Sequence, residues 1–110
     1  MPLLERLRVE VYIPDLPSVE YQNLLNSFEA EFTYAFGGSS VLRGLEGCYL
    51  SKRGERIWDR INLIYCDSPL ALSTNAASVT AYVGELKRAA MEALAEETVL
   101  VSVHQVYRPV

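Results

Sequence analysis

Side chains that bind metals or move protons are scarce in this sequence. It contains one histidine, His104, and two cysteines, Cys48 and Cys66, which are too far apart for a CxxC motif. Zinc and iron sites need several such ligands at short spacing, so we predict no metal site and no cofactor. We expect both cysteines to be small core residues. A disulfide between them would form only if their strands bring the two side chains together.

Positive charge and long apolar runs are also lacking. The formal net charge is -4 at pH 7, which disfavours a general attraction to nucleic acid or to anionic membranes. No apolar run approaches the roughly 20 residues that cross a bilayer, and the amino-terminal segment already includes Glu5 and Arg6. We therefore predict a cytoplasmic protein with no nucleic-acid partner and no membrane partner.

The composition that is present is that of a folded domain. Half of the 110 residues are hydrophobic and 22% are charged, which is typical of a compact globular chain. A chain of this length supports one hydrophobic core, so we predict a single domain over residues 1–110.

The first part of the chain alternates between apolar and polar side chains and then changes period. The alternation predicts a strand whose apolar face comprises Leu7, Val9, Val11 and Ile13. Ser18 is placed to cap a helix that continues to about Tyr34 or Phe36 and ends at the glycine pair 37–38. The apolar stripe of this helix comprises Tyr21, Leu24, Leu25, Phe28 and Phe32.

A hairpin is predicted in the middle of the chain. Residues 40–51 are expected to form an edge strand in which Gly44 and Gly47 indicate either a bulge or a close approach by another backbone. Residues 52–55 form the turn and residues 56–66 the returning strand. The predicted core face of the returning strand comprises Ile57, Asp59, Ile61, Leu63 and Tyr65. Its opposite face is predicted to comprise Trp58, Arg60, Asn62 and Ile64.

A second helix and a last strand complete the expected order. Thr74 or Asn75 is placed to cap a helix through Ala95, and residues 98–108 alternate as a strand. One face of that strand is predicted to comprise Leu100, Ser102, His104 and Val106. The order βαββαβ predicts an α+β, ferredoxin-like fold, in which a four-stranded antiparallel sheet carries two helices on one face.

The sheet face away from the helices is the predicted functional surface. It mixes polar and charged side chains with aromatic and aliphatic ones, which makes it too apolar for a fully hydrated surface. We therefore predict a homo-oligomer, either a dimer or a trimer, that buries this face. The binding residues predicted on it are Tyr12, Trp58, Arg60, Asn62 and His104.

Two residues have a catalytic and a structural interpretation. His104 is the natural general base if the chain is an enzyme, but we favour a hydrogen-bonded structural or interface role for it. Asp59 would need a partner or a raised pKa if it faced the core, and we favour a solvated position near the end of the hairpin. We predict no catalytic residue.

One short segment resembles the second strand of PII-like signalling proteins. The segment is Gly38-Ser39-Ser40-Val41-Leu42-Arg43-Gly44-Leu45-Glu46-Gly47. It has the small residue, the valine, the arginine–glycine pair and the further glycine that precede a mobile loop in that family. The resemblance implies a ferredoxin-like trimer that binds nucleotides or other small effectors in clefts between subunits. The residues that it implicates are Val41, Arg43, Gly44 and Gly47.

Two functions are compatible with these patterns. The one we favour is a noncatalytic oligomeric module that binds or senses a small molecule or a protein partner, because no catalytic set of residues emerges. The alternative is a small dimeric α+β barrel enzyme with a pocket between two sheets near His104.

Overall fold

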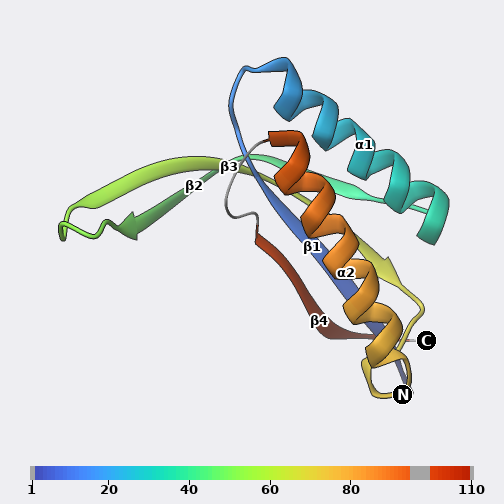
Figure 1. The fold of residues 1–110 in the computed structure, drawn as a ribbon. Helices are drawn as coiled ribbons and strands as arrows, with labels where there is room; N and C mark the ends of the chain where they lie inside the picture. The colour runs from blue at the N-terminus through green and yellow to red at the C-terminus, as the bar shows by residue number, and fades with distance from the viewer. Residues whose placement is uncertain (1, 95–99, 110) are drawn as a thin grey trace.

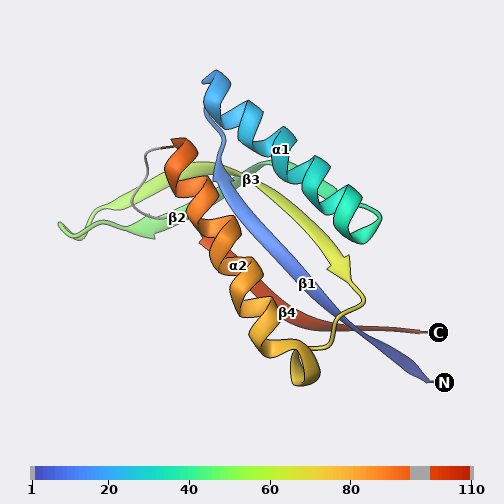
Figure 2. The ribbon, with the colours of Figure 1, turned by 45° about the vertical axis from the view of Figure 1, so that its right-hand side comes forward.

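The chain folds into one antiparallel sheet covered by two helices. The computed structural model describes residues 2–94 and 100–109. Its elements are β1 (Leu3–Pro14), α1 (Val19–Phe36), β2 (Ser40–Leu50), β3 (Arg56–Ser68), α2 (Leu72–Leu94) and β4 (Leu100–Pro109). The sheet order is β2-β3-β1-β4, and both helices lie on the same face (Figures 1 and 2). The predicted ferredoxin-like arrangement is therefore confirmed.

β1 lies between β3 and β4 and supplies one side of the core. Its four predicted apolar positions are each at most 2% exposed, as predicted: Leu7, Val9, Val11 and Ile13. Val9, Val11 and Ile13 form one core cluster with the apolar stripe of α1, in which Leu25 and Phe32 are almost fully buried. Burying an aliphatic or aromatic side chain of this size contributes about 1.5–3 kcal/mol, so this layer is the main source of stability. β1 begins at Leu3, ahead of the predicted strand, because it also pairs with the end of β4.

The ends of α1 are set by the residues that the sequence indicated. Ser18 has an extended backbone, and its hydroxyl accepts a hydrogen bond from the backbone N–H of Glu20 at 3.3 Å. Gly37 ends the helix in the left-handed conformation, with φ of 90°, and its N–H donates to the carbonyl of Thr33 at 2.9 Å.

α2 differs from the prediction at its start. The helix begins at Leu72, ahead of the predicted caps Thr74 and Asn75, and Asn75 has non-helical backbone angles inside it. The Asn75 side chain accepts a hydrogen bond from the backbone N–H of Ala71 at 3.1 Å, which holds the preceding turn in place. The predicted end of this helix, Ala95, lies outside the described residues. No helix in residues 2–94 is long and apolar enough to cross a membrane, nor does the later described segment contain one.

The predicted faces of β3 are wrong, because its pairing with β1 shifts them by one residue. Ile64 pairs with Val11, and Cys66 pairs with Val9, so these two β3 residues face the helices with the core of β1. Asn62 shares that face and is only 2% exposed. The segment has apolar residues at both alternate positions, so its own pattern does not decide which set faces the helices.

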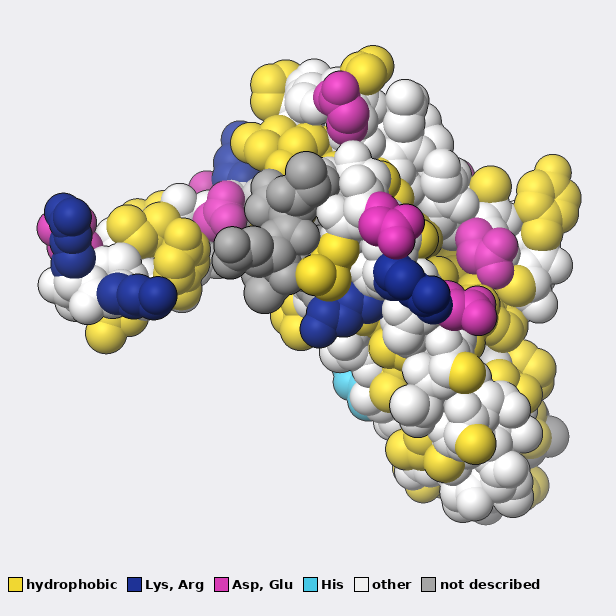
Figure 3. All heavy atoms as spheres, in the orientation of Figure 1, with side chains coloured by type: hydrophobic (Ala, Val, Ile, Leu, Met, Phe, Trp, Pro, Cys, Tyr) yellow, Lys and Arg dark blue, Asp and Glu magenta, His cyan; other side chains and the backbone are white. Residues whose placement is uncertain are grey.

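β2 and β3 continue beyond the sheet body as a projecting hairpin. We call residues 45–61 the hairpin arm (Figures 1 and 3). The sheet order confirms the predicted edge position of β2. A register shift between Leu42 and Leu45 confirms a bulge at Gly44, whereas Gly47 pairs in regular register with Asp59. Cys48 is exposed on this arm, which corrects its predicted core position, whereas Cys66 is buried and both thiols are free. Asp59 is also exposed there, in agreement with the solvated position that the sequence favoured.

A buried asparagine anchors the base of the hairpin arm. The side-chain oxygen of Asn62 accepts a hydrogen bond from the backbone N–H of Gly44 at 2.9 Å. Its side-chain nitrogen donates to the carboxylate of Asp15 at 3.2 Å. Asn62 therefore joins the bulge in β2 to the connection between β1 and α1, and Gly44 holds a φ of 66° at this point.

Replacement of Gly44 by alanine tests this bulge. A left-handed backbone costs a residue with a Cβ roughly 1–2 kcal/mol, so Gly44→Ala should lower the free energy of unfolding by about that amount. Gly47→Ala is the matched control, because Gly47 lies on the same strand and an added Cβ meets nothing within 4 Å. Urea unfolding at one protein concentration measures both variants. Equal stability of the two variants would contradict the account of the bulge.

Candidate functional site

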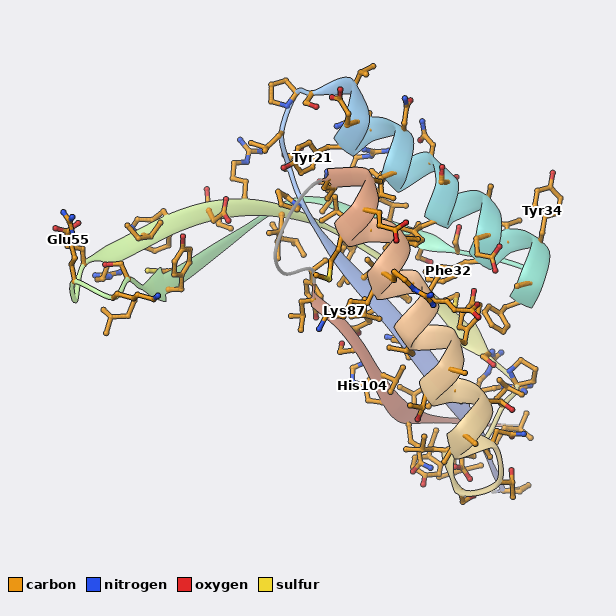
Figure 4. The ribbon with its side chains drawn as sticks, viewed as in Figure 1. Tyr21, Phe32, Tyr34, Glu55, Lys87 and His104 are labelled. Atoms are coloured by element: carbon orange, nitrogen blue, oxygen red, sulfur yellow. The ribbon has the colours of Figure 1, made fainter. Side chains whose placement is uncertain are left out.

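The candidate site is the sheet face opposite the helices, which we call the open face. Pairing with β1 places on it Arg6, Arg8, Glu10 and Tyr12 of β1, Leu63, Tyr65 and Asp67 of β3, and Leu100, Ser102, His104 and Val106 of β4. No described element of the chain covers this face in Figures 1 and 2. Figure 4 shows His104 on β4, away from α1 and α2.

Glu10 is the centre of a hydrogen-bond network on the open face. Its side chain is 10% exposed, although no helix lies above it. The hydroxyl of Tyr12 donates to Glu10 Oε2 at 2.7 Å, and that of Ser102 donates to the same oxygen at 3.3 Å. His104 Nε2 lies 2.8 Å from Glu10 Oε1. Because an ionised carboxylate only accepts hydrogen bonds, this ring nitrogen is the donor.

These contacts change the acidity of the groups in the network. Burial raises the pKa of Glu10, but the hydrogen bonds from Tyr12 and His104 outweigh burial, so the pKa lies below its ordinary value. The hydrogen bond to Glu10 raises the pKa of the Tyr12 phenol, and burial acts in the same direction. The network therefore holds an ionised carboxylate beside a neutral phenol at neutral pH.

An ion pair extends the polar surface from β1 to β3. The guanidinium of Arg8 donates two hydrogen bonds to Asp67, at 2.8 and 3.1 Å, and lies 4.4 Å from the centre of the Tyr65 ring. The bond from Arg8 lowers the pKa of Asp67, and the charges of Arg108 and Arg6 act in the same direction. We call Arg6, Arg8 and Arg108 the arginine corner. Three cations around one carboxylate make this corner positive on a chain of negative net charge.

A hollow of about 310 Å³ adjoins the arginine corner. It is lined by residues 36–40 at the end of α1 and the start of β2, and by Tyr65, Cys66 and Asp67 of β3. Burial raises the pKa of the Cys66 thiol to about 12, so this cysteine is protonated and a poor nucleophile at neutral pH. The hollow contains part of the segment that resembles PII-like proteins.

The structure does not gather the predicted binding residues into one site. Tyr12 and His104 meet at Glu10 on the open face. Asn62 lies on the opposite face, where its hydrogen bonds support the hairpin arm. Trp58 and Arg60 line a separate hollow of about 470 Å³ at the base of that arm, beside the connection between β1 and α1.

Arg43, the remaining predicted residue, is exposed in β2 beside the bulge. The other residues implicated by the family resemblance have different environments. Val41 packs against the core, Gly44 occupies the bulge, and an added Cβ at Gly47 meets no atom within 4 Å.

Sequence reasoning misses the residue that organises the site. The alternation of β1 places Glu10 on the open face between Arg8 and Tyr12, but an isolated acidic residue on a strand gives no sign of burial. Its partners Ser102 and His104 are more than 90 residues away, and the register of β1 with β4 brings them to it. The usable signal is therefore the shared face, and the contacts themselves depend on the register.

Within residues 2–94 and 100–109, no group of three or more histidine, cysteine, aspartate or glutamate side chains could hold a metal ion. The chemistry that the open face offers is hydrogen bonding, positive charge at the arginine corner and a carboxylate-held imidazole.

Replacement of Glu10 by glutamine should destabilise the protein in a pH-dependent way. At pH 7 we expect a loss of about 1–3 kcal/mol, because charge-assisted hydrogen bonds become neutral ones. The pKa of Glu10 is lowered in the folded state, so its contribution is full above the unfolded value of about 4.3 and is lost as pH falls through the folded value. The difference between wild type and Glu10→Gln should therefore shrink below about pH 4.

Urea unfolding of both proteins between pH 7 and pH 3 measures this effect. Glu29→Gln is the matched control, because Glu29 is exposed on α1 and the same charge is removed there. A constant difference across the pH range would show that the carboxylate charge of Glu10 does not contribute.

Comparison with known proteins identifies the fold. No protein-family model matches the sequence, and no curated protein matches it. A solved structure of CPII, a nitrogen regulatory PII-like protein from Thiomonas intermedia K12 bound to ADP, AMP and bicarbonate, is 16% identical with a TM-score of 0.51. The match covers 99% of this chain and 100% of that one.

CutA from Synechococcus elongatus PCC7942 is a second structural neighbour. It is 14% identical, with a TM-score of 0.55, and the match covers 96% of this chain and 82% of that one. At these identities the likeness concerns the fold alone. The resemblance of residues 38–47 to PII-like proteins is thus confirmed at the level of the fold, which this chain shares with PII-like and CutA proteins along nearly its whole length.

Proposed function

We propose that this chain is a noncatalytic, homo-oligomeric regulatory module that binds a small anionic effector beside its open face. The observation that carries the proposal is the open face itself. It combines a nearly buried carboxylate network with a positive corner, and the chain's own helices cover only the opposite side. Such a mixed face fits a surface shared by subunits better than one left in water.

The hairpin arm supports the oligomeric part of the proposal. An isolated two-stranded hairpin is marginally stable in water, and three or more strands or a covering element are normally needed. Large apolar side chains are nevertheless exposed along the arm: Tyr49 is 56%, Leu50 70% and Trp58 63% exposed. Figure 3 shows this apolar surface together with basic side chains near the tip of the arm. A second copy of the chain packed on the arm would bury these side chains.

The arginine corner supports the effector part. Arg6 and Arg108 act on Asp67 through their charges, whereas the hydrogen bonds to its carboxylate come from Arg8. A positive site next to a hollow of about 310 Å³ suits a small anion such as a phosphate group or bicarbonate. The structural neighbour CPII was solved with ADP, AMP and bicarbonate bound. By analogy, we infer that this chain takes an effector of the same chemical class.

One observation favours a second candidate, the dimeric barrel enzyme. His104 is held by a carboxylate, and its side chain is 53% exposed, which is the arrangement of an oriented general base. In that case the open faces of two subunits would enclose a wet pocket at His104. A dry, filled interface over His104 in a structure of the assembly would exclude it.

Light scattering after size-exclusion chromatography tests the oligomer. We expect wild type to be a dimer or trimer at micromolar concentration. Trp58→Glu should weaken association by about a hundredfold or more, because the interface would have to bury a carboxylate. Leu50→Glu provides a second test on the same arm.

Tyr34→Glu is the matched control for these variants. Tyr34 is 90% exposed on α1, and Figure 4 shows it pointing away from the sheet. Tyr34→Glu should therefore leave the molar mass of the assembly unchanged. A monomeric wild type, or equal effects of Trp58→Glu and Tyr34→Glu, would contradict the proposed interface.

Isothermal titration of the wild-type assembly with ADP, AMP and bicarbonate tests the effector. We expect at least one of the three to bind, and Arg108→Gln should weaken it roughly tenfold, which is the contribution of one charge-assisted contact. Arg88→Gln is the matched control, because Arg88 is an exposed arginine on α2. If none of the probes binds, the effector part of the proposal is rejected. The oligomeric part is tested separately by the molar mass.

A further inference from the structure

The helix side of the molecule contains an apolar cavity that the proposed function does not use. Its volume is about 260 Å³, and it lies between β1, the end of α1 and the first half of α2. The apolar and aromatic walls are Leu7, Val9, Phe36, Leu70, Val79 and Tyr82. The cavity lies on the face of the sheet opposite to the arginine corner and contains no residue of the hairpin arm, and it shares only Phe36 with the hollow of about 310 Å³.

The chemistry of the walls excludes charged and strongly polar occupants. No lining residue is ionised at neutral pH. The hydroxyl of Tyr82 donates to Glu31 at 2.9 Å. The oxygen of the fully buried Ser68 accepts a hydrogen bond from the N–H of Leu70 at 3.1 Å. The buried polar groups of the lining are therefore already in use within the protein.

Such a cavity is also a poor site for water. A buried water normally makes two to four hydrogen bonds, and apolar cavities of roughly 150 Å³ stay dry and accept benzene. This cavity is larger, and Phe36 and Tyr82 form an edge-to-face pair, with ring centres 5.6 Å apart, in its wall. A flat aromatic or short branched aliphatic molecule matches these walls in size and polarity.

The position of the cavity gives a route to solvent. Ser78 in its lining is exposed and Leu70 is half-buried, which places this part of the lining at the protein surface. The turn that precedes the regular part of α2 is separated from it by the non-helical Asn75.

We propose that this cavity is a binding site for a small, uncharged, apolar molecule, of the size of a substituted benzene ring. Binding there would join β1, α1 and α2 more tightly and would raise the stability of the helix layer. The site differs from the proposed anion site in its chemistry and in every lining residue except Phe36, which lines both.

Toluene and benzoate are the matched probes for this site. They have similar size and shape, but the benzoate carboxylate would be buried without a partner. In methyl NMR spectra of the wild-type assembly, toluene should give saturable shifts centred on Leu7, Val9 and Val79 and should raise the unfolding temperature. Benzoate at the same concentration should do neither. The absence of saturable shifts with toluene, or equal shifts with benzoate, would overturn the proposal.

A variant that fills the cavity completes the test. Val79→Phe should weaken the toluene response at least tenfold, whereas Val83→Phe introduces the same ring on α2 at a residue outside the lining and should preserve it. Leu70→Phe fills the cavity from the loop and replaces Val79→Phe if that variant does not fold. An unchanged toluene response in the folded filling variant would place binding elsewhere and contradict the proposal.

Discussion

The buried carboxylate of Glu10 imposes the constraint on which the open face depends. A carboxylate with little exposure must be hydrogen-bonded, and its partners come from β1 itself and from β4. The register of β4, the last strand, against β1 meets this requirement, because it places Ser102 and His104 beside Glu10. The other face of β1 carries the core and holds both helices. One strand therefore organises both sides of the molecule. It holds the helix side by hydrophobic burial and the open face by hydrogen bonds.

Local sequence patterns predict much of the fold, because the residues that form and end several elements lie within or next to those elements. The alternation of β1, the Ser18 cap and the Gly37 termination of α1 are local effects, and each agrees with the structure. The faces of β3 could not be predicted in this way. Its apolar residues occupy both alternate positions, and its polar Asn62 is buried because a distant bulge needs a hydrogen-bond acceptor.

The candidate site is less predictable than the fold for the same physical reason. Tyr12 and His104 lie on the open face as predicted, but the group that joins them, Glu10, has no sequence signature of burial. The alternation in β3 alone predicts Trp58 and Arg60 on this face, and they lie instead at the base of the hairpin arm. The register between strands far apart in the sequence determines which residues meet at such a site. Alternation in a single sequence does not give this register.

The functional proposal follows from two surfaces that the isolated chain leaves unexplained, the open face and the hairpin arm. The arm projects from the sheet body, and it exposes Trp58 and Leu50 without a third strand beside them. The proposed second copy of the chain would cover the apolar side chains of the arm.

Hydrogen–deuterium exchange of the backbone of residues 45–61, measured over a range of protein concentrations, tests this account most directly. If the arm is buried between subunits, its amides become protected as concentration rises, in parallel with those of the open face, while those of α1 show no such dependence. Rapid exchange along the arm at every concentration would contradict the account.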